Sequence, residues 1–290
     1  MSRWTWIALW LAAAFAGDRL FAYVLRQAAE GSGFRYSRLY TGRGEADIVL
    51  IGNSRGLNFY QPYLEARTGR STLNLSYNAM PVQLSAALLR DYRERYGAPE
   101  VLVADVTHLD RDNVDLIREF RVYAQFSPRL DSLLRAEDPK IWGGTEVSHL
   151  TRYGGEVAQR MFYYLTRGDE DWIVDRTIAP SVVADTIGLG AYHLGIAEHR
   201  LAEFADVVRE YRAAGTEVVL VVNPYYPAFA RSIGNLEALT AAVEAATGVP
   251  VRDYSTAVEG EAYFGDYQHL NKRGAEVYLG RLVGEVGLGE

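Results

Sequence analysis

Three residues, placed toward opposite ends of the chain, have the side chains that nucleophilic catalysis requires. Ser54 follows the apolar run 48–51, and Asp266 and His269 stand three residues apart before the last helical pattern. Serine is a weak nucleophile at neutral pH, so it needs an imidazole to take its proton and a carboxylate to orient that imidazole. The short spacing allows one turn of the chain to bring the acid and the histidine together. These residue types predict a triad with Ser54 as nucleophile, His269 as base and Asp266 as orienting acid.

A triad needs a scaffold that delivers distant residues to one place, and the chain has the pattern of one. Five short apolar runs are typical of buried parallel strands, at 46–52, 72–75, 100–106, 217–223 and 249–253. Helical patterns follow most of them, at 61–68, 81–96, 192–214, 235–247 and 272–286. This alternation predicts an α/β fold with a five-stranded parallel sheet and helices on both faces.

The carboxyl ends of the predicted strands should form one rim, where the ligands of open parallel sheets bind. Polar or small residues follow four of the strands at this rim, namely Ser54, the pair Asn78 and Ala79, Asp105, and Asn223. We expect the acid and the histidine before the last helix to lie at the same rim.

A second pair, Asp105 and His108, has the same spacing as the predicted acid and base. Two interpretations stay open for it: a strand-end aspartate beside an ordinary loop histidine, or side chains that line the substrate pocket. The sequence has no paired spacing typical of metal ligands and no glycine-rich phosphate loop. It therefore predicts no metal and no cofactor.

Two short blocks of the sequence resemble those of a known family. Gly52-Asn53-Ser54, and the run from Asp266 to Asn271 with Gly274 beyond it, resemble the first and last blocks of the SGNH/GDSL hydrolase superfamily. The resemblance covers roughly 46–286 without an internal insert. It implies a flavodoxin-like three-layer α/β/α fold, ester hydrolysis or O-acyl transfer, and the triad roles given above.

The chain departs from the family pattern at three places. Asn53 stands where the first block usually has aspartate, and we expect it to supply a local hydrogen bond in the turn. Ala79 replaces a glycine whose backbone N–H helps to form the oxyanion hole. The third block is absent, and the candidates to replace it are Asp105, Thr107 and Asn223. We expect the oxyanion donors to be the backbone N–H groups of Ser54 and Ala79, with the Asn78 side chain as a further donor.

The N-terminal segment 1–30 predicts a membrane anchor or a cleaved signal sequence. Its first 17 residues contain three tryptophans and no acid. A helix over 4–25 would be about 33 Å long, enough to cross a bilayer. The run Ala14-Phe15-Ala16 also fits a signal-peptidase site, while a buried helix of a cytosolic protein is the third alternative. We expect an extracytoplasmic protein that is either anchored or secreted.

The rest of the chain divides into a glycine-containing linker at 31–45 and an α/β domain at 46–290. Between the third and fourth strands the alternation lapses over 107–191, a segment too long for a structureless loop. We interpret it as a helical cap that closes over one edge of the sheet. A net charge of −7 without a basic patch argues against a nucleic-acid partner. The absence of cysteine excludes disulfides and a thiol nucleophile.

Two functional classes are compatible with these features. The first is a serine esterase or O-acyltransferase that acts on acyl esters, with acetyl the expected group, of a glycan or another cell-envelope polymer. The apolar N-terminus and the insert resemble the branch of the superfamily that works beside membrane-bound O-acyltransferases, which implies such a protein as a partner. The second class is a catalytically weak scaffold or binding subunit of a polymer-modifying complex, favoured by the missing third block.

Overall fold

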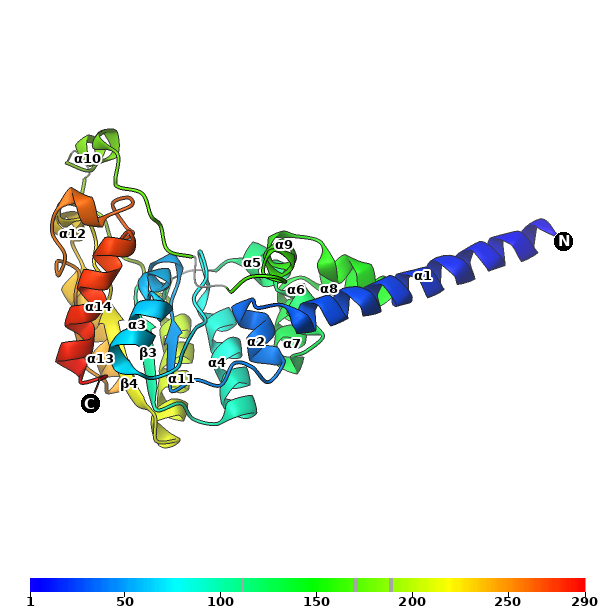
Figure 1. Ribbon diagram of the computed structural model, residues 1–290, viewed down its shortest axis with the longest axis horizontal. Coiled ribbons are helices and arrows are strands. Elements are labelled where there is room, and N and C mark those ends of the chain that lie inside the picture. Colours follow the sequence, from blue (N-terminus) through cyan, green and yellow to red (C-terminus); the bar gives the residue numbers. More distant parts are fainter. Residues whose placement is uncertain (111, 169–171, 188–189, 290) are drawn as a thin grey trace. The chain divides into compact units, whose positions relative to one another are not determined.

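The computed structural model describes residues 1–110, 112–168, 172–187 and 190–289 (Figure 1). The chain forms two compact units. Unit 1 combines Met1–Gly44 with Val114–Asp169, and unit 2 combines Glu45–Asn113 with Glu170–Glu290.

Unit 2 contains a five-stranded parallel sheet in the order β2-β1-β3-β4-β5. The strands are β1 Ile48–Ile51, β2 Thr72–Asn74, β3 Val101–Asp105, β4 Glu217–Val222 and β5 Val251–Asp253. The 2-1-3-4-5 order is that of flavodoxin-like folds, in which the strand order reverses between the first and third strands. The predicted fold class is confirmed, and the reversal falls beside the strand that ends just before Ser54.

Strands β1 and β3 are buried throughout and β4 over its last four residues, as expected of parallel strands covered by helices, whereas the edge strand β5 is largely exposed. Leu50 pairs with Val103, and Val103 pairs with Val219. All three belong to one buried cluster that also contains Tyr278, Leu279 and Leu282 from the last helix. Their neighbours along each strand point to the opposite face, because successive side chains of a strand alternate.

Two layers of helices cover the sheet of unit 2. Helices α3 (Gln61–Thr68) and α14 (Lys272–Val286) pack against each other, and α11 (Glu198–Ala213) packs against both α4 (Val82–Tyr96) and α13 (Leu236–Thr247). Shorter elements complete the unit: η1 Ser54–Asn58, α10 Pro180–Ile187, α12 Pro227–Ser232 and η3 Glu261–Tyr263.

The predicted element bounds agree with the structure to within two residues, with two exceptions. The N-terminal helix expected over 4–25 continues to Gly31. The helix expected over 192–214 begins only at Glu198. The residues before it run alongside another part of unit 2, where Tyr192 forms a parallel bridge with Ile233. The backbone N–H of Leu194 donates to the Asn235 side chain at 2.8 Å, so these backbone groups have non-helical partners.

Unit 1 is helical and contains α1 Arg3–Gly31, α2 Arg35–Tyr40, α5 Val114–Glu119, α6 Arg121–Ala124, α7 Pro128–Glu137, α8 Pro139–Val147, η2 His149–Tyr153 and α9 Glu156–Tyr163. Within 31–45, which we expected to be a linker, residues 35–40 form α2, and five of the six residues of that helix are buried. Phe34 and Tyr36 are fully buried and pack edge to face, with ring centroids 5.1 Å apart. The Phe34 ring also stacks on Tyr164 from the insert, at 5.5 Å.

The predicted insert 107–191 is divided between the two units. Its helices α5 to α9 form unit 1 together with the N-terminal segment, whereas α10 belongs to unit 2. That the insert caps the sheet stays a prediction. Helix α1 is the one helix in the described part of the chain that is long and apolar enough to cross a membrane. A signal sequence has the same length and composition.

Two glycines of helix α14 differ in the space around them and allow a matched test of how this helix is seated. A Cβ at Gly274 would collide with the backbone oxygen of Tyr263, whereas Gly284 has open space. We expect Gly274→Ala to lower the free energy of unfolding by roughly 2 kcal/mol or more, because backbone must move. Gly284→Ala should raise it by about 0.5–1 kcal/mol, because alanine favours the helix.

Denaturant unfolding of the two purified variants measures this difference. Equal stability of the two variants would contradict the close seating of α14 against the turn that precedes it.

Candidate active site

The first part of the site is the turn that follows β1. The Asn53 side chain accepts a hydrogen bond from the backbone N–H of Arg55 at 2.9 Å, which caps the short helix η1. This is the local bond that we expected of Asn53. The turn is closed further by the backbone N–H of Gly56, which donates to the Asn53 carbonyl at 3.0 Å. Ser54 is therefore held as the first residue of η1, partly exposed at the strand end.

The second part is a tight turn that leads into α14. Phe264 and Leu270 form an antiparallel bridge, and the backbone N–H of Gly265 donates to the His269 carbonyl at 2.9 Å. Within this turn Asp266 Oδ1 accepts from the backbone N–H groups of Gln268, at 2.8 Å, and His269, at 3.0 Å. The carboxylate is thus fixed by its own turn before it meets any side chain.

The start of α14 anchors the turn. Asn271 is the N-cap residue: its Oδ1 accepts from the backbone N–H of Gly274 at 3.1 Å, and its Nδ2 donates to the Ala262 carbonyl at 2.8 Å. Because the cap ties the helix start to the residues before the turn, the segment between them has little freedom to move.

The two parts meet through the imidazole of His269. Its Nε2 lies 2.8 Å from Ser54 Oγ, and its Nδ1 lies 2.9 and 3.0 Å from the two carboxylate oxygens of Asp266. The side chains of His269 and Asp266 are 25% and 28% exposed, so both are shielded but reachable. The structure thus brings together the three residues that the sequence nominated, across 215 positions. This geometry permits Nε2 to accept the serine proton while Nδ1–H donates to the carboxylate.

The environment of Asp266 favours its ionised form. Burial alone would raise the pKa of this carboxyl, but hydrogen bonds from the His269 side chain and from two backbone N–H groups outweigh it. The pKa consequently lies below the ordinary value of 3.8. An ionised Asp266 can both hold the tautomer of His269 and stabilise the imidazolium that proton transfer would create.

The loop after β2 lies beside the nucleophile turn. A Cβ on Gly56 would collide with the Ser76 side chain, so the two segments approach closely. In this loop Ala79 has a φ of 53°, a left-handed conformation that alanine rarely adopts, and its carbonyl accepts from Asn113 Nδ2 at 2.9 Å. Among the described residues, no acceptor is bonded to the backbone N–H of Ser54 or of Ala79. Both therefore keep the donors that we expected for an oxyanion, whereas Asn78 is exposed.

The candidates for the missing third block are turned inward. Asp105 is fully buried and accepts from the backbone N–H of Thr107 at 2.9 Å, from the Thr107 hydroxyl, and from the backbone N–H of Asn223 at 3.1 Å. Asn223 is also fully buried; its Nδ2 donates to the Arg55 carbonyl at 3.0 Å and its Oδ1 accepts from the Tyr278 hydroxyl at 2.6 Å. These side chains form hydrogen bonds inside the fold that stabilise the strand ends. They do not point donors toward the carboxyl edge of the sheet.

Arg55, which directly follows the serine, is a residue that sequence reasoning missed. Its side chain is 3% exposed and lies 4.0 Å from the fully buried Asp105 carboxylate. The guanidinium donates to Thr107 Oγ1 at 3.3 Å and to the Asn223 carbonyl, and it stacks 3.3 Å from the centre of the Tyr225 ring. Burial raises the pKa of Tyr225, which keeps the phenol neutral beneath the cation. In the sequence, an arginine between Ser54 and Gly56 indicates a buried ion pair only when it is considered together with Asp105 at the end of the third strand.

The second pair, Asp105 and His108, is buried beneath the strand ends. The Asp105 carboxylate is engaged by Thr107 and Asn223, and the buried His108 ring lies edge to face against Phe204, with centroids 6.4 Å apart. In the described residues no group of three or more His, Asp or Glu side chains is arranged to hold a metal ion.

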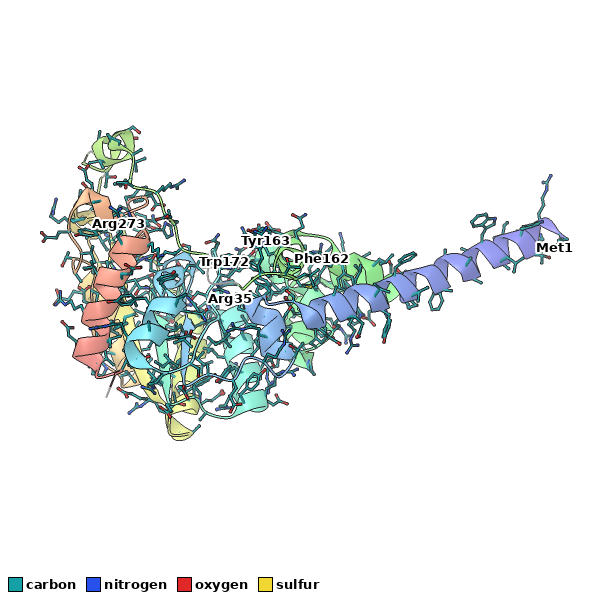
Figure 2. All side chains as sticks on the ribbon, viewed as in Figure 1. Met1, Arg35, Phe162, Tyr163, Trp172 and Arg273 are labelled. Atoms are coloured by element: carbon teal, nitrogen blue, oxygen red, sulfur yellow. The ribbon has the colours of Figure 1, made fainter. Side chains whose placement is uncertain are left out.

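A segment of the predicted insert flanks the turn that carries Asp266 and His269. Val174 forms a parallel bridge with Asn271, and the backbone N–H of Ile178 donates to the Phe264 carbonyl at 2.7 Å. Trp172, labelled in Figure 2, packs on Tyr77 of the loop after β2, with ring centroids 5.4 Å apart. This segment therefore touches both the turn that carries Asp266 and His269 and the loop that contains Asn78 and Ala79.

Comparison with known proteins adds one distant likeness. No model of a protein family matches the chain, and no curated protein matches it. Among solved structures, the chain is similar to a candidate acylhydrolase from Bacteroides fragilis, with 13% identity over 82% of this chain and 86% of that chain and a TM-score of 0.39. A likeness this distant carries no functional argument, so the case for a function depends on the residues described above.

The pKa of Asp266 leads to an expected pH dependence of stability. Because its native pKa lies below 3.8, the unfolded chain binds more protons as the pH falls through this range. The stabilisation by the carboxylate is present above the unfolded pKa and is lost as the pH falls through the native pKa. The free energy of unfolding of wild type minus that of Asp266→Asn should be constant above about pH 5 and shrink below about pH 4. A difference that stays constant down to acid unfolding would contradict this.

The buried pair of Arg55 and Asp105 predicts a strong effect on stability. Asp105→Ala should lower the free energy of unfolding by about 3–5 kcal/mol, because it leaves a buried guanidinium without its counter-charge. The matched control is Asp112→Ala, which breaks a 2.7 Å pair with Arg200 in which the aspartate is 61% exposed. The control should lose about 1 kcal/mol or less in the same denaturant titration. Equal losses in the two variants would show that the buried carboxylate has no special role.

Proposed function

We propose that the protein is a serine acyl-ester hydrolase or O-acyltransferase. The observation that carries the proposal is the hydrogen-bond chain from Ser54 Oγ through His269 to Asp266 at the carboxyl edge of a parallel sheet. This chain of contacts supplies the nucleophile, its base and the group that orients the base.

The proposed reaction proceeds through an acyl-enzyme. Ser54 Oγ attacks the carbonyl carbon of an acyl ester while His269 Nε2 takes the hydroxyl proton, and the carbonyl oxygen becomes an oxyanion facing the N–H groups of Ser54 and Ala79. The ester bond then breaks, and the proton passes from His269 to the departing alcohol. A water molecule or an acceptor hydroxyl attacks the acyl-serine in turn, with His269 again taking and returning the proton.

The proposed substrate is an acyl ester of a glycan or another cell-envelope polymer, with acetyl as the expected group. The resemblance to the SGNH/GDSL superfamily and the membrane-span character of α1 support an extracytoplasmic, anchored location. The same resemblance supports a membrane-bound O-acyltransferase as a partner that would supply the acyl group.

A scaffold without turnover is the second candidate function. This function is favoured by Asp105 and Asn223, which form hydrogen bonds inside the fold. Neither side chain therefore takes the place of the donor that the third block supplies in the family. In this case the fold would bind the polymer or a partner, and the triad geometry would be a remnant.

An acetyl-ester assay separates the two functions. We expect the full chain in detergent to hydrolyse p-nitrophenyl acetate and to carry one acetyl group on the peptide that contains Ser54. Ser54→Ala should abolish acylation, and His269→Ala should lower kcat by about 10³-fold or more, because members of a triad act as a unit. Mass spectrometry of the trapped enzyme and steady-state rates provide the measurement.

The matched control is Ser132→Ala, which removes an exposed serine on α7 and should leave the rate unchanged. Turnover that survives Ser54→Ala would overturn the proposed mechanism. A wild-type chain that neither turns over a broad set of small esters nor becomes acylated would favour the scaffold.

A further inference from the structure

The apolar surface of α1 does not end where the rest of unit 1 begins. Side chains project from every side of its N-terminal half, from the labelled Met1 onward (Figure 2). The tryptophans at positions 4 and 10 are 79% and 72% exposed. Farther along, Ala22 and Ala29 are buried against unit 1, but Leu20, Phe21 and Val24 on another face are still 55–63% exposed. The exposed apolar surface thus runs from Trp4 to Val24.

The length of this surface decides how deep the helix must sit in a bilayer. The part exposed on all sides, 4–16, is about 20 Å long, which is too short for roughly 30 Å of hydrocarbon. The whole apolar face, 4–24, is about 31 Å long and matches it. Between Arg3 and Arg26 the only charged residues are Asp18 and Arg19. If α1 crosses the membrane, Asp18 lies about 9 Å and Arg19 about 7.5 Å inside the boundary at Val24.

Asp18 and Arg19 are turned away from the lipid side and into unit 1. Their side chains pair at 2.5 Å and are 14% and 29% exposed. Asp18 accepts hydrogen bonds from the Ser148 hydroxyl at 2.5 Å and from the backbone N–H groups of His149, at 2.9 Å, and Leu150, at 3.2 Å. The ion pair therefore provides partners for the backbone of the junction between α8 and η2.

The Arg19 side chain provides hydrogen-bond donors for the carbonyl groups of the same junction. Its guanidinium donates to the last carbonyls of α8, those of Glu146, at 3.4 Å, and Val147, at 3.4 and 3.5 Å. Irregular backbone is tolerated at membrane depth only where its polar groups have partners within the protein. The junction satisfies that condition through the two charged residues of α1.

Two of the outward-facing side chains at this junction are apolar, and the outward-facing Glu146, 51% exposed, is neutralised by Arg152. Val147 is 79% exposed and Leu150 is 37% exposed. The charged neighbours Glu146 and Arg152 pair with each other at 3.0 Å. The junction lies at the level of α1 that the length of the apolar face places inside the bilayer, so its surface is continuous with that of the span.

We propose that the edge formed by Val147 and Leu150 is immersed in the phospholipid bilayer that α1 crosses. Unit 1 then contacts the bilayer in two ways, through the spanning helix α1 and through a shallow edge that does not cross the membrane. Asp18 and Arg19 connect the helix to this edge. The second contact fixes the rotation of α1 about its axis, which a single span leaves free. This inference concerns unit 1 alone and does not depend on the chemistry of Ser54.

The absence of cysteine from the chain makes a direct test possible. Four single-cysteine variants carry an environment-sensitive fluorophore: Val147→Cys and Leu150→Cys at the edge, with Trp10→Cys and Gln27→Cys as lipid and water references on α1. Each is reconstituted as one copy per nanodisc of phosphatidylcholine and phosphatidylglycerol. Quenching is measured with nitroxide-labelled lipid and, separately, with aqueous iodide.

We expect the labels at positions 147 and 150 to be quenched by the nitroxide lipid and protected from iodide, as at position 10. The label at position 27 should behave in the opposite way. Because position 147 is mostly exposed, a label there does not disturb the core, and unchanged thermal unfolding of each variant verifies this.

Three outcomes would overturn the proposal. The first is iodide quenching at position 147 equal to that at position 27. The second is protection of position 147 from both quenchers, which would mean that protein covers the edge. The third is a purified chain whose mass shows that the residues before Gly17 have been removed. Loss of esterase activity has no bearing on these readouts.

Discussion

A single buried carboxylate, that of Asp105, holds together the strand ends on which the site is built. Its oxygens accept the backbone N–H groups that follow β3 and β4, and Arg55 brings the end of β1 to the same place. Three strands that are far apart in the sequence are thus fixed at one edge by hydrogen bonds and one ion pair. A buried charge without such partners would be very unfavourable, so the network specifies a single arrangement of these ends.

The other half of the site is rigid for a different reason. The turn from Phe264 to Leu270 is short, and its acid is held by backbone N–H groups before it contacts the imidazole. Asn271 then ties the turn to the first residues of α14. The histidine therefore needs no long-range partner to be oriented. The Ser54–His269 contact results from two independently rigid segments that the sheet and α14 bring face to face.

The sequence was sufficient for the sheet, for most helices and for the proximity of Ser54, Asp266 and His269, because each is marked by a local pattern. Apolar runs mark the strands, and the spacing of Asp266 and His269 before a capped helix marks the turn. It was not sufficient for Arg55, whose partner Asp105 is 50 positions away. Nor was it sufficient for α2, whose Tyr36 and Tyr40 pack on aromatic rings of the insert. Residues 192–197 were mistaken for helix because their apolar pattern does not reveal that other parts of unit 2 bind their backbone.

Ala79 bears on whether the site is used. A left-handed alanine is less stable than a glycine by about 1 kcal/mol or more, and such strain persists only where neighbouring contacts enforce it. Here Asn113 holds the Ala79 carbonyl, and the N–H of Met80 donates to the Tyr77 carbonyl at 3.3 Å. These contacts keep the strained conformation and leave the Ala79 N–H without a described partner. Strained backbone clusters at functional sites, so a left-handed Ala79 in the loop beside the nucleophile turn agrees with the catalytic proposal, despite the missing third block.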